Sequence, residues 1–182
     1  MSVAPPPDTI FTIGHSTHGA EEFLALVRRH EIAALADVRR FPSSLRLPQF
    51  NASALADSLA DEGSSYVQLG DALGGRRKAV PDSVNTGWRV HGFQGYADHM
   101  ASEEFRSALA ELEGLGRERR TAFMCAEGPW WRCHRQLIAD ALLARGWSVH
   151  HVMPDGRLQE HRLTPFAVVE GQSVTYPGGT LA

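Results

Sequence analysis

The sequence contains little cysteine, a single lysine and no long apolar run. Two Cys among 182 residues, both within the same short stretch, fit a reduced compartment better than a secreted disulfide scaffold. No apolar stretch approaches the roughly 20 residues that cross a bilayer. Residues 1–7 lack the basic start and the apolar core of a signal peptide. We therefore expect a cytoplasmic protein that has no membrane as a partner.

The charge of the chain is nearly balanced. A formal net charge of −3 at pH 7 offers no general attraction to nucleic acid or to an anionic membrane. Lys78 is the only lysine, so almost all of the 18 basic residues are arginines. Arginine forks match carboxylates and phosphates, which favours anion sites, although a compositional bias of the genome explains the same excess.

Length and periodicity predict one α/β domain. With 182 residues, of which 43% are hydrophobic, the chain can bury a single core. Five short runs have the apolar, β-branched character of buried strands: 9–14, 33–38, 66–69, 121–125 and 147–152. Helical patterns occupy four segments: 20–30, the stretch between Asn51 as N-cap and Gly63, 93–116 with a break near Ser102, and 133–145.

This alternation of strands and helices predicts the topology. Short connections and right-handed crossovers give a mostly parallel sheet of about five strands with helices on its faces. The expected fold is an α/β three-layer sandwich of the flavodoxin or Rossmann kind, with an extra edge strand around Gly156 at the C-terminal end. We expect residues 8–170 to form the domain, and residues 1–7 and 171–182 to be flexible termini.

Residues 70–92 interrupt the regular pattern. They contain Gly74, Gly75 and Arg76, followed by further turn signals. A loop of this length inside a compact domain is more often a lid or a binding loop than a plain connection. A disordered insertion is the alternative.

Reactive and charged side chains follow four of the predicted strands. Ligands of open α/β sheets bind beyond the carboxyl ends of the strands, so these residues are candidates for function. The candidates for a catalytic acid, base or nucleophile are His15, Asp37, Cys125 and Glu127. The candidates for ligand binding are Ser16, Thr17, Arg39, Arg40, Gln49, Gly74, Gly75, Arg76, His134 and Arg135. The arginines among them can hold anionic groups.

Several of these candidates have a structural alternative. Ser16 or Thr17 can cap the first helix, whose N-terminus then offers an anion site. Asp37 can serve only to pair with Arg39 or Arg40, and a histidine such as His15 can satisfy a backbone carbonyl. The sequence leaves these alternatives open.

Cys125 is the strongest single candidate. It follows a strand, precedes a Gly-Pro turn and has arginines nearby, an electropositive setting that lowers the pKa of a thiol and suits a nucleophile. An inert core cysteine is the alternative. Cys133 can pair with Cys125 in a redox reaction, but spacing alone does not establish disulfide geometry, and we expect it to pack at the helix start. Cys125, Cys133 and His134 can also be considered as metal ligands, although the Cys-x7-Cys-His spacing is not that of structural zinc sites.

Two enzyme classes share features with this chain. The Asp37–Arg39 run and the loop after Cys125 are similar to parts of rhodanese-like sulfurtransferases and cysteine-dependent phosphatases. The phosphatase loop needs an arginine six positions after the cysteine, where this chain has Trp131. The loop is also not rich in Gly and Ser, so the sequence does not predict a phosphate cradle of backbone N–H groups.

Taken together, the motifs resemble the bacterial and archaeal family catalogued as domain of unknown function 488 (DUF488). The matching motifs are Ile13-Gly14-His15-Ser16-Thr17, Asp37-Val38-Arg39 with Phe41-Pro42, Pro48-Gln49-Phe50-Asn51, Leu73-Gly74-Gly75, and Cys125-Ala126-Glu127 with Cys133-His134-Arg135. Leu47 departs from the family, which commonly has Asn there. The resemblance implies a compact three-layer α/β fold and a shared site, built from His15, Asp37, Arg39, Cys125, Glu127, His134 and Arg135. It implies no established activity.

Three functions remain open at this point. The favoured one is an enzyme that binds a small anionic or nucleotide-like ligand in the crevice at the strand ends, with a thiol as candidate nucleophile. The second is a module that binds nucleic acid or protein through a basic patch and three tryptophans: Arg39, Arg40, Arg76, Arg77, Lys78, Trp88, Trp130 and Trp131. The third is a metal site that uses Cys and His. The sequence names neither a cofactor nor an oligomeric state.

Overall fold

The strands form one six-stranded sheet and one small hairpin. The computed structural model describes residues 8–179. The large sheet contains β1 (Thr9–Gly14), β2 (Ala34–Asp37), β3 (Ser65–Gln68), β4 (Thr121–Cys125), β5 (Ser148–Val152) and β6 (Leu158–Glu160), in the spatial order β3-β2-β4-β1-β5-β6. The first five strands pair in parallel, and β6 runs antiparallel along β5 at the edge. The predicted edge strand near Gly156 is therefore confirmed.

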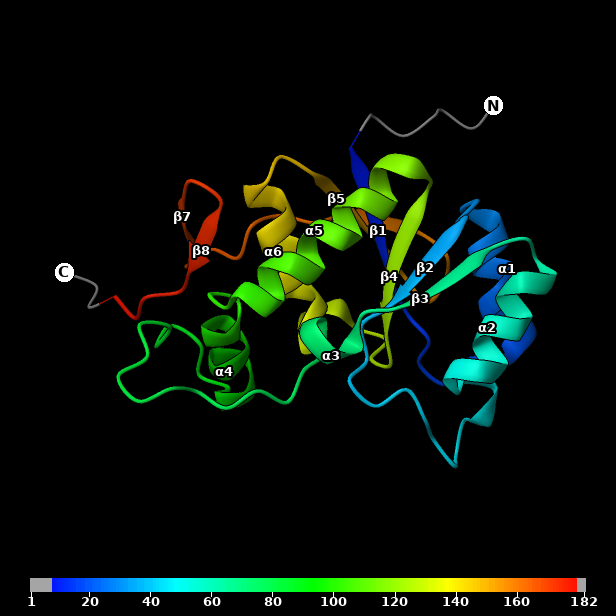
Figure 1. The fold of residues 1–182 in the computed structure, drawn as a ribbon, viewed down its shortest axis with the longest axis horizontal. Coiled ribbons are helices and arrows are strands. Elements are labelled where there is room, and N and C mark those ends of the chain that lie inside the picture. Colours follow the sequence, from blue (N-terminus) through cyan, green and yellow to red (C-terminus); the bar gives the residue numbers. More distant parts are fainter. Residues whose placement is uncertain (1–7, 180–182) are drawn as a thin grey trace.

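Helices cover both faces of the large sheet (Figure 1). On one face lie α1 (Ala20–Arg29) and α2 (Ala52–Asp61), together with the short 3-10 turn η1 (Pro48–Phe50). On the other lie α3 (Gly70–Leu73), α4 (His91–His99), α5 (Glu103–Glu118) and α6 (Arg135–Ala144), with β7 (Val168–Glu170) and β8 (Ser173–Thr175) paired beyond α6. The α/β three-layer sandwich is thus confirmed.

Two apolar cores result from this layering. Phe23, Phe50 and Leu55 pack under α1 and α2, and Phe105 and Ile138 lie in the larger core on the opposite face. The strands β1, β2 and β4 are buried along their whole length because both of their faces are covered. This buried centre holds the carboxyl ends of β1, β2 and β4 rigidly side by side.

Local signals explain where two of the helices begin. Ser102 caps α5, since its Oγ accepts a hydrogen bond of 3.1 Å from the Phe105 N–H, and the predicted break at this position is confirmed. Asn51 precedes α2 as predicted, but its side chain does not cap that helix. The Asn51 Oδ1 instead accepts a 2.6 Å hydrogen bond from the Ser44 N–H, which closes the preceding loop.

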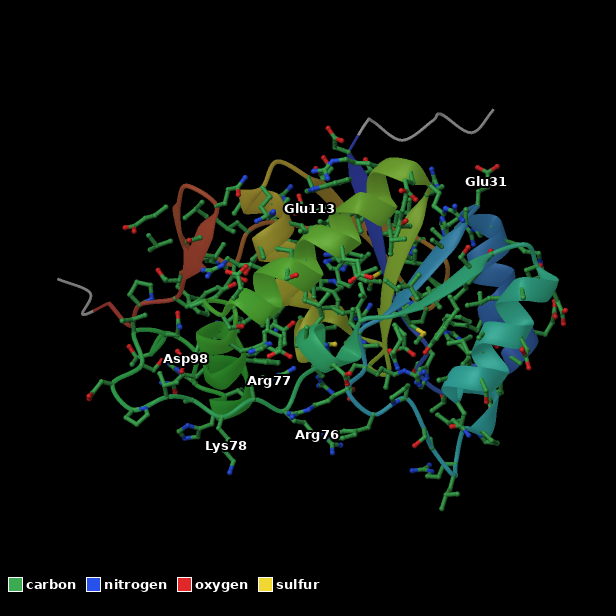
Figure 2. The ribbon with its side chains drawn as sticks, in the orientation of Figure 1. Glu31, Arg76, Arg77, Lys78, Asp98 and Glu113 are labelled. Atoms are coloured by element: carbon green, nitrogen blue, oxygen red, sulfur yellow. The ribbon has the colours of Figure 1, made fainter. Side chains whose placement is uncertain are left out.

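The segment 70–92 has one short helix and a long irregular part. α3 fills 70–73, and residues 74–90 contain no regular element. Asp98 of α4 ties this loop to the body of the protein: its carboxylate accepts hydrogen bonds from the Val80 N–H at 2.9 Å and the Asn85 amide at 2.8 Å. Figure 2 shows Asp98 beside the loop, and Arg76 and Lys78 pointing outward from it.

The C-terminal segment packs against α6. Residues 171–179, which fall in the stretch expected to be flexible, contain β8 and Tyr176, whose side chain is fully buried. The Tyr176 hydroxyl donates a 2.8 Å hydrogen bond to Asp140 of α6. Residues 1–7 and 180–182, also expected to be flexible, lie outside the described residues. None of the helices within 8–179 has the length and apolar character needed to cross a membrane.

Candidate functional site

The carboxyl ends of three neighbouring strands define the candidate site. The order β2-β4-β1 brings the segments after Asp37, Cys125 and Gly14 together. Backbone hydrogen bonds join them: the His15 N–H donates to the Cys125 carbonyl at 3.0 Å, and the Val38 N–H donates to the Met124 carbonyl at 2.9 Å. The predicted convergence of strand ends is therefore present in the fold.

A pocket of about 360 Å³ opens at this edge. It is lined by residues from the ends of β2 and β4, the loop after α3, α4 and the start of α6: Arg39, Arg40, Phe41, Gly75, Arg76, Val90, Gly92, Phe93, Tyr96, Cys125, Ala126, Glu127, Arg132, Cys133 and His134. Four of these residues are arginines, and Glu127 is the one acid among them. The lining therefore favours an anion.

Cys133 lies in this lining at the N-terminus of α6. Its Sγ accepts a hydrogen bond of 3.4 Å from the Arg135 N–H and lies 3.6 Å from Nδ1 of His134. Burial by itself raises the pKa of this thiol. The hydrogen bond with Cys125 and the charge and N–H groups of Arg135 outweigh burial and lower the pKa to about 7. Cys133 is therefore the more acidic of the two thiols.

Arg135 supplies the buried positive charge beside the thiols. Its guanidinium is fully buried and donates to the Glu127 carbonyl at 2.6 Å, the Gly128 carbonyl at 3.0 Å and the Thr12 hydroxyl at 3.1 Å. Its Nε has no hydrogen-bond partner of ordinary geometry within the described residues. Burial opposes its charge, but the neighbouring thiols raise the pKa of Arg135 above its ordinary value. A buried cation held by neutral groups favours a thiolate as its counter-charge.

Gly14 allows β1 to approach this centre. A Cβ atom at Gly14 would lie 1.8 Å from the Glu127 carbonyl oxygen and 2.9 Å from the Arg135 guanidinium. Only glycine fits this close contact. A larger residue at position 14 would therefore displace either the end of β1 or the hydrogen bond between Glu127 and Arg135.

Cys125 is buried more deeply than its position after a strand suggests from the sequence. It is buried at the end of β4, and its Sγ points to the Glu127 carbonyl at 3.8 Å. Burial raises the pKa of Cys125 well above its ordinary value, and the neighbouring Cys133 raises it further. The positive charge of Arg135 also acts to lower the pKa of Cys125, but burial outweighs it there, whereas at Cys133 it does not.

His134 is held in one orientation between the backbone and Cys133. Its Nε2 lies 3.2 Å from the Val38 carbonyl, so it carries the proton and donates it there. Burial lowers the pKa of His134, which keeps the ring neutral. The Nδ1 atom that faces Cys133 is consequently an acceptor, and it can take a proton from the thiol.

Asp37, Arg39 and His15 form a second polar cluster directly behind the pocket. The Asp37 carboxylate accepts hydrogen bonds from Arg39 at 2.9 and 2.7 Å and from the Tyr66 hydroxyl at 2.5 Å. His15 stacks on Phe50 with the ring centres 4.4 Å apart, and its Nε2 accepts from Arg39 at 3.3 Å. Burial lowers the pKa of His15, so this ring is neutral. The cluster fixes Arg39, which alone among its ionisable members lines the pocket.

Comparison with known proteins places the chain in a family. The family model described as "Domain of unknown function DUF488" matches residues 19–142. The chain belongs to this family. No curated protein matches it, and no solved structure does.

The predicted site residues of this DUF488 protein fall into two groups. Those that line the pocket are Arg39, Arg40, Gly75, Arg76, Cys125, Glu127 and His134. Those outside the lining are His15, Ser16, Thr17, Asp37, Gln49, Gly74 and Arg135. Arg135 and Asp37 contact or adjoin lining residues, whereas Thr17 is exposed and the Gln49 amide donates to the His18 carbonyl at 3.2 Å.

Ser16 and Thr17 do not cap the first helix. The N-cap of α1 is Gly19, and no side chain caps it. Ser16 takes a left-handed backbone conformation with φ 49°, and its N–H donates to the Ala126 carbonyl at 2.9 Å. Neither residue therefore marks an anion site at the start of α1, and the helix N-terminus that lies at the pocket belongs to α6.

Sequence reasoning missed Phe41 as a member of the DUF488 pocket. Cys133 packs in the larger core as expected, and it also lies in the pocket lining, which was not expected. The Phe41 ring is 59% exposed, and the guanidinium groups of Arg40 and Arg76 lie 5.7 and 5.4 Å from its centre. This ring can stack on a planar ligand while the arginines hold its anionic group. The run Cys133-His134-Arg135 at a helix start was the signal that could have marked Cys133 as a candidate of low pKa.

Two of the three tryptophans proposed to stack on bases are occupied by internal contacts. Trp88 packs against Phe93, Phe166 and Tyr176, and Trp130 stacks on His151 with the ring centres 4.4 Å apart. Trp131 is the exposed one, at 49%. Residues 8–179 also contain no group of three His, Cys, Asp or Glu side chains placed to hold a metal ion.

Proposed function

We propose that this protein is a thiol-dependent enzyme that binds a small anionic or nucleotide-like substrate in the arginine-lined pocket. The observation that carries the proposal is the position of Cys133. Its Sγ accepts the Arg135 N–H at 3.4 Å at the start of α6 and faces the same pocket as four arginines. A thiol ionised at neutral pH beside an anion site is the arrangement of a nucleophilic catalyst.

The surrounding residues have distinct roles in this proposal. Arg39, Arg76 and Arg132 bind the anionic group of the substrate, and Phe41 stacks on its planar part. His134 accepts the thiol proton through Nδ1 and returns a proton to the leaving group. Two free thiols at a working site also favour a reducing compartment, so we propose a cytoplasmic location.

Alkylation kinetics test this proposal. We expect iodoacetamide to modify Cys133 before Cys125 at pH 7, and inorganic phosphate or adenosine monophosphate to slow the reaction severalfold. We also compare negatively charged iodoacetate with neutral iodoacetamide. The ratio of their rates should be higher for Cys133 than for free cysteine, because the pocket attracts anions.

A matched variant identifies the site of protection. Arg76→Gln removes one exposed cation of the lining, whereas Arg106→Gln removes an exposed cation of α5 that lies outside it. Protection by phosphate should weaken in the first variant and persist in the second. Equal protection in both variants, or labelling of Cys133 no faster than that of a buried thiol, would contradict the proposal.

A further inference from the structure

We propose that Cys125 and Cys133 form a dithiol–disulfide redox centre, with Cys133 as the attacking thiol, Cys125 as the resolving thiol and a small carboxylate-bearing disulfide as the oxidant. This inference rests on the proposed function, since it uses the same pocket and the same nucleophile. It goes further in that it assigns a reaction to the second cysteine and a chemical class to the substrate.

The placement of the two sulfur atoms carries the inference. Cys125 ends β4 and Cys133 begins the turn into α6, so the chain leaves the sheet at one cysteine and enters the helix at the other. Both side chains are free thiols, both line the same pocket, and each thiol lies close enough to shift the pKa of the other. A substrate sulfur bound to Cys133 is thus within reach of Cys125.

The surroundings of the two thiols assign the order of events. Cys133 contacts the Arg135 N–H and His134, which stabilise its thiolate and receive its proton. Cys125 contacts the Glu127 carbonyl, an acceptor that favours the protonated thiol. Cys133 therefore attacks first, and Cys125 keeps its proton until a mixed disulfide forms. In thiol–disulfide exchange the attacking group is a thiolate, so the thiol that is more ionised attacks first.

The pocket lining selects the oxidant. Arg39, Arg40, Arg76 and Arg132 line the pocket together with the two cysteines, whereas Glu127 is the one acid in the lining. A disulfide that carries carboxylates gains from this lining, and a disulfide that carries ammonium groups is repelled by it. Buried Arg135 adds a fifth positive charge directly behind the thiols.

The reaction balances without a further reagent. The Cys133 thiolate attacks one sulfur of the substrate, the S–S bond of the substrate breaks, and one thiolate leaves with the proton that Cys133 had given up. The Cys125 sulfur then attacks the Cys133 sulfur of the mixed disulfide, and its proton goes to the second leaving thiolate by way of His134. Two protein thiols are oxidised to one disulfide, and one substrate disulfide is reduced to two thiols.

Oxidised glutathione, which carries carboxylates, and cystamine, which carries two amines, are the probes. We expect oxidised glutathione to oxidise the reduced full-length protein at least tenfold faster than cystamine, after correction for their rates with free cysteine. The wild-type protein should lose two hydrogen atoms by intact-mass spectrometry and release two glutathione thiols per chain, with no adduct remaining. This measurement needs no variant and is unaffected by folding defects.

Two variants separate the roles of the thiols. In Cys125→Ser the reaction should stop at a stable glutathione adduct on Cys133. In Cys133→Ser any adduct should form much more slowly than the adduct of Cys125→Ser. A lasting adduct on the wild-type protein, an adduct on Cys125, or equal rates with cystamine would overturn the inference. If Cys133 is still alkylated rapidly at pH 7 and protected by phosphate in that case, the proposed function survives. If rapid alkylation is also absent, both fail.

Discussion

The interaction between the two cysteines predicts a measurable change in the acidity of Cys133. Cys125→Ala removes the neighbouring thiol that lowers the pKa of Cys133, an effect attributable to a hydrogen bond from Cys125 to the Cys133 thiolate. A hydrogen bond to a charged group contributes about 1.5–3 kcal/mol, and each 1.36 kcal/mol is worth about one pKa unit. The pKa of Cys133, about 7 in the wild-type protein, should therefore rise to about 8 or 9 in the variant.

The expected loss of reactivity is smaller than the loss of thiolate. The thiolate fraction at pH 7 should fall from about one half to between one tenth and one hundredth. A more basic thiolate is intrinsically more nucleophilic, so the rate at pH 7 should fall only about twofold to sixfold. The alkylation rate as a function of pH measures both effects, and its midpoint is the more sensitive quantity.

Cys125→Ser is the matched control for this prediction. The serine hydroxyl keeps a hydrogen-bond donor at nearly the same position, so the midpoint for Cys133 should stay closer to the wild-type value. Both variants lose a buried sulfur at a cost of roughly 1 kcal/mol, which does not distinguish them. An unchanged midpoint in Cys125→Ala, or equal shifts in the two variants, would refute the proposed contact.

Two further predictions concern stability and use urea denaturation. Gly14→Ala should destabilise the protein by about 1–3 kcal/mol, because the added Cβ meets the Glu127 carbonyl. Gly114→Ala in α5 is the control: its Cβ meets no neighbouring atom within 4 Å, and it should stabilise the protein by about 0.5–1 kcal/mol. A Gly14→Ala variant with unchanged stability would show that the end of β1 does not approach the Glu127 carbonyl closely. Tyr176→Phe should cost about 1–3 kcal/mol because Asp140 loses a buried donor, and wild-type stability would contradict that contact.

Most of the longer regular elements were predictable because local features of the sequence mark them. The strand at 121–125 and the helix break at Ser102 follow from apolar runs and from a capping residue, which are local features. α3 was not predicted because four residues are too few to show a helical period. Asn51 has the composition of a cap, but a contact with Ser44 takes up its side chain.

The site was predictable in position but not in its chemistry. Parallel topology placed His15, Asp37 and Cys125 at one edge, as the sequence indicated. The acidity of Cys133 depends on Arg135, whose guanidinium folds back onto the Glu127 carbonyl. Such contacts between distant elements leave no local pattern, so the sequence singled out Cys125 and offered no signal for the acidity of Cys133.

The role of the Asp37 side chain illustrates the same limit. Its position after a strand suits a catalytic acid or a structural ion pair equally well, and the sequence left both open. Hydrogen bonds from Arg39 and Tyr66 occupy its carboxylate, which favours the structural role. Tyr66 belongs to the neighbouring strand β3, and its contribution becomes visible only in the folded protein.

The central claim is that Cys133 is the ionised thiol at an anion-binding pocket. The most direct test is alkylation of the wild-type protein by isotope-labelled iodoacetamide across pH 5–10, with the two cysteine peptides quantified separately. We predict that Cys133 reacts first, with a midpoint at about pH 7, and that Cys125 stays unmodified until much higher pH. Preferential labelling of Cys125, or a Cys133 midpoint near that of free cysteine at about 8.5, would contradict the account.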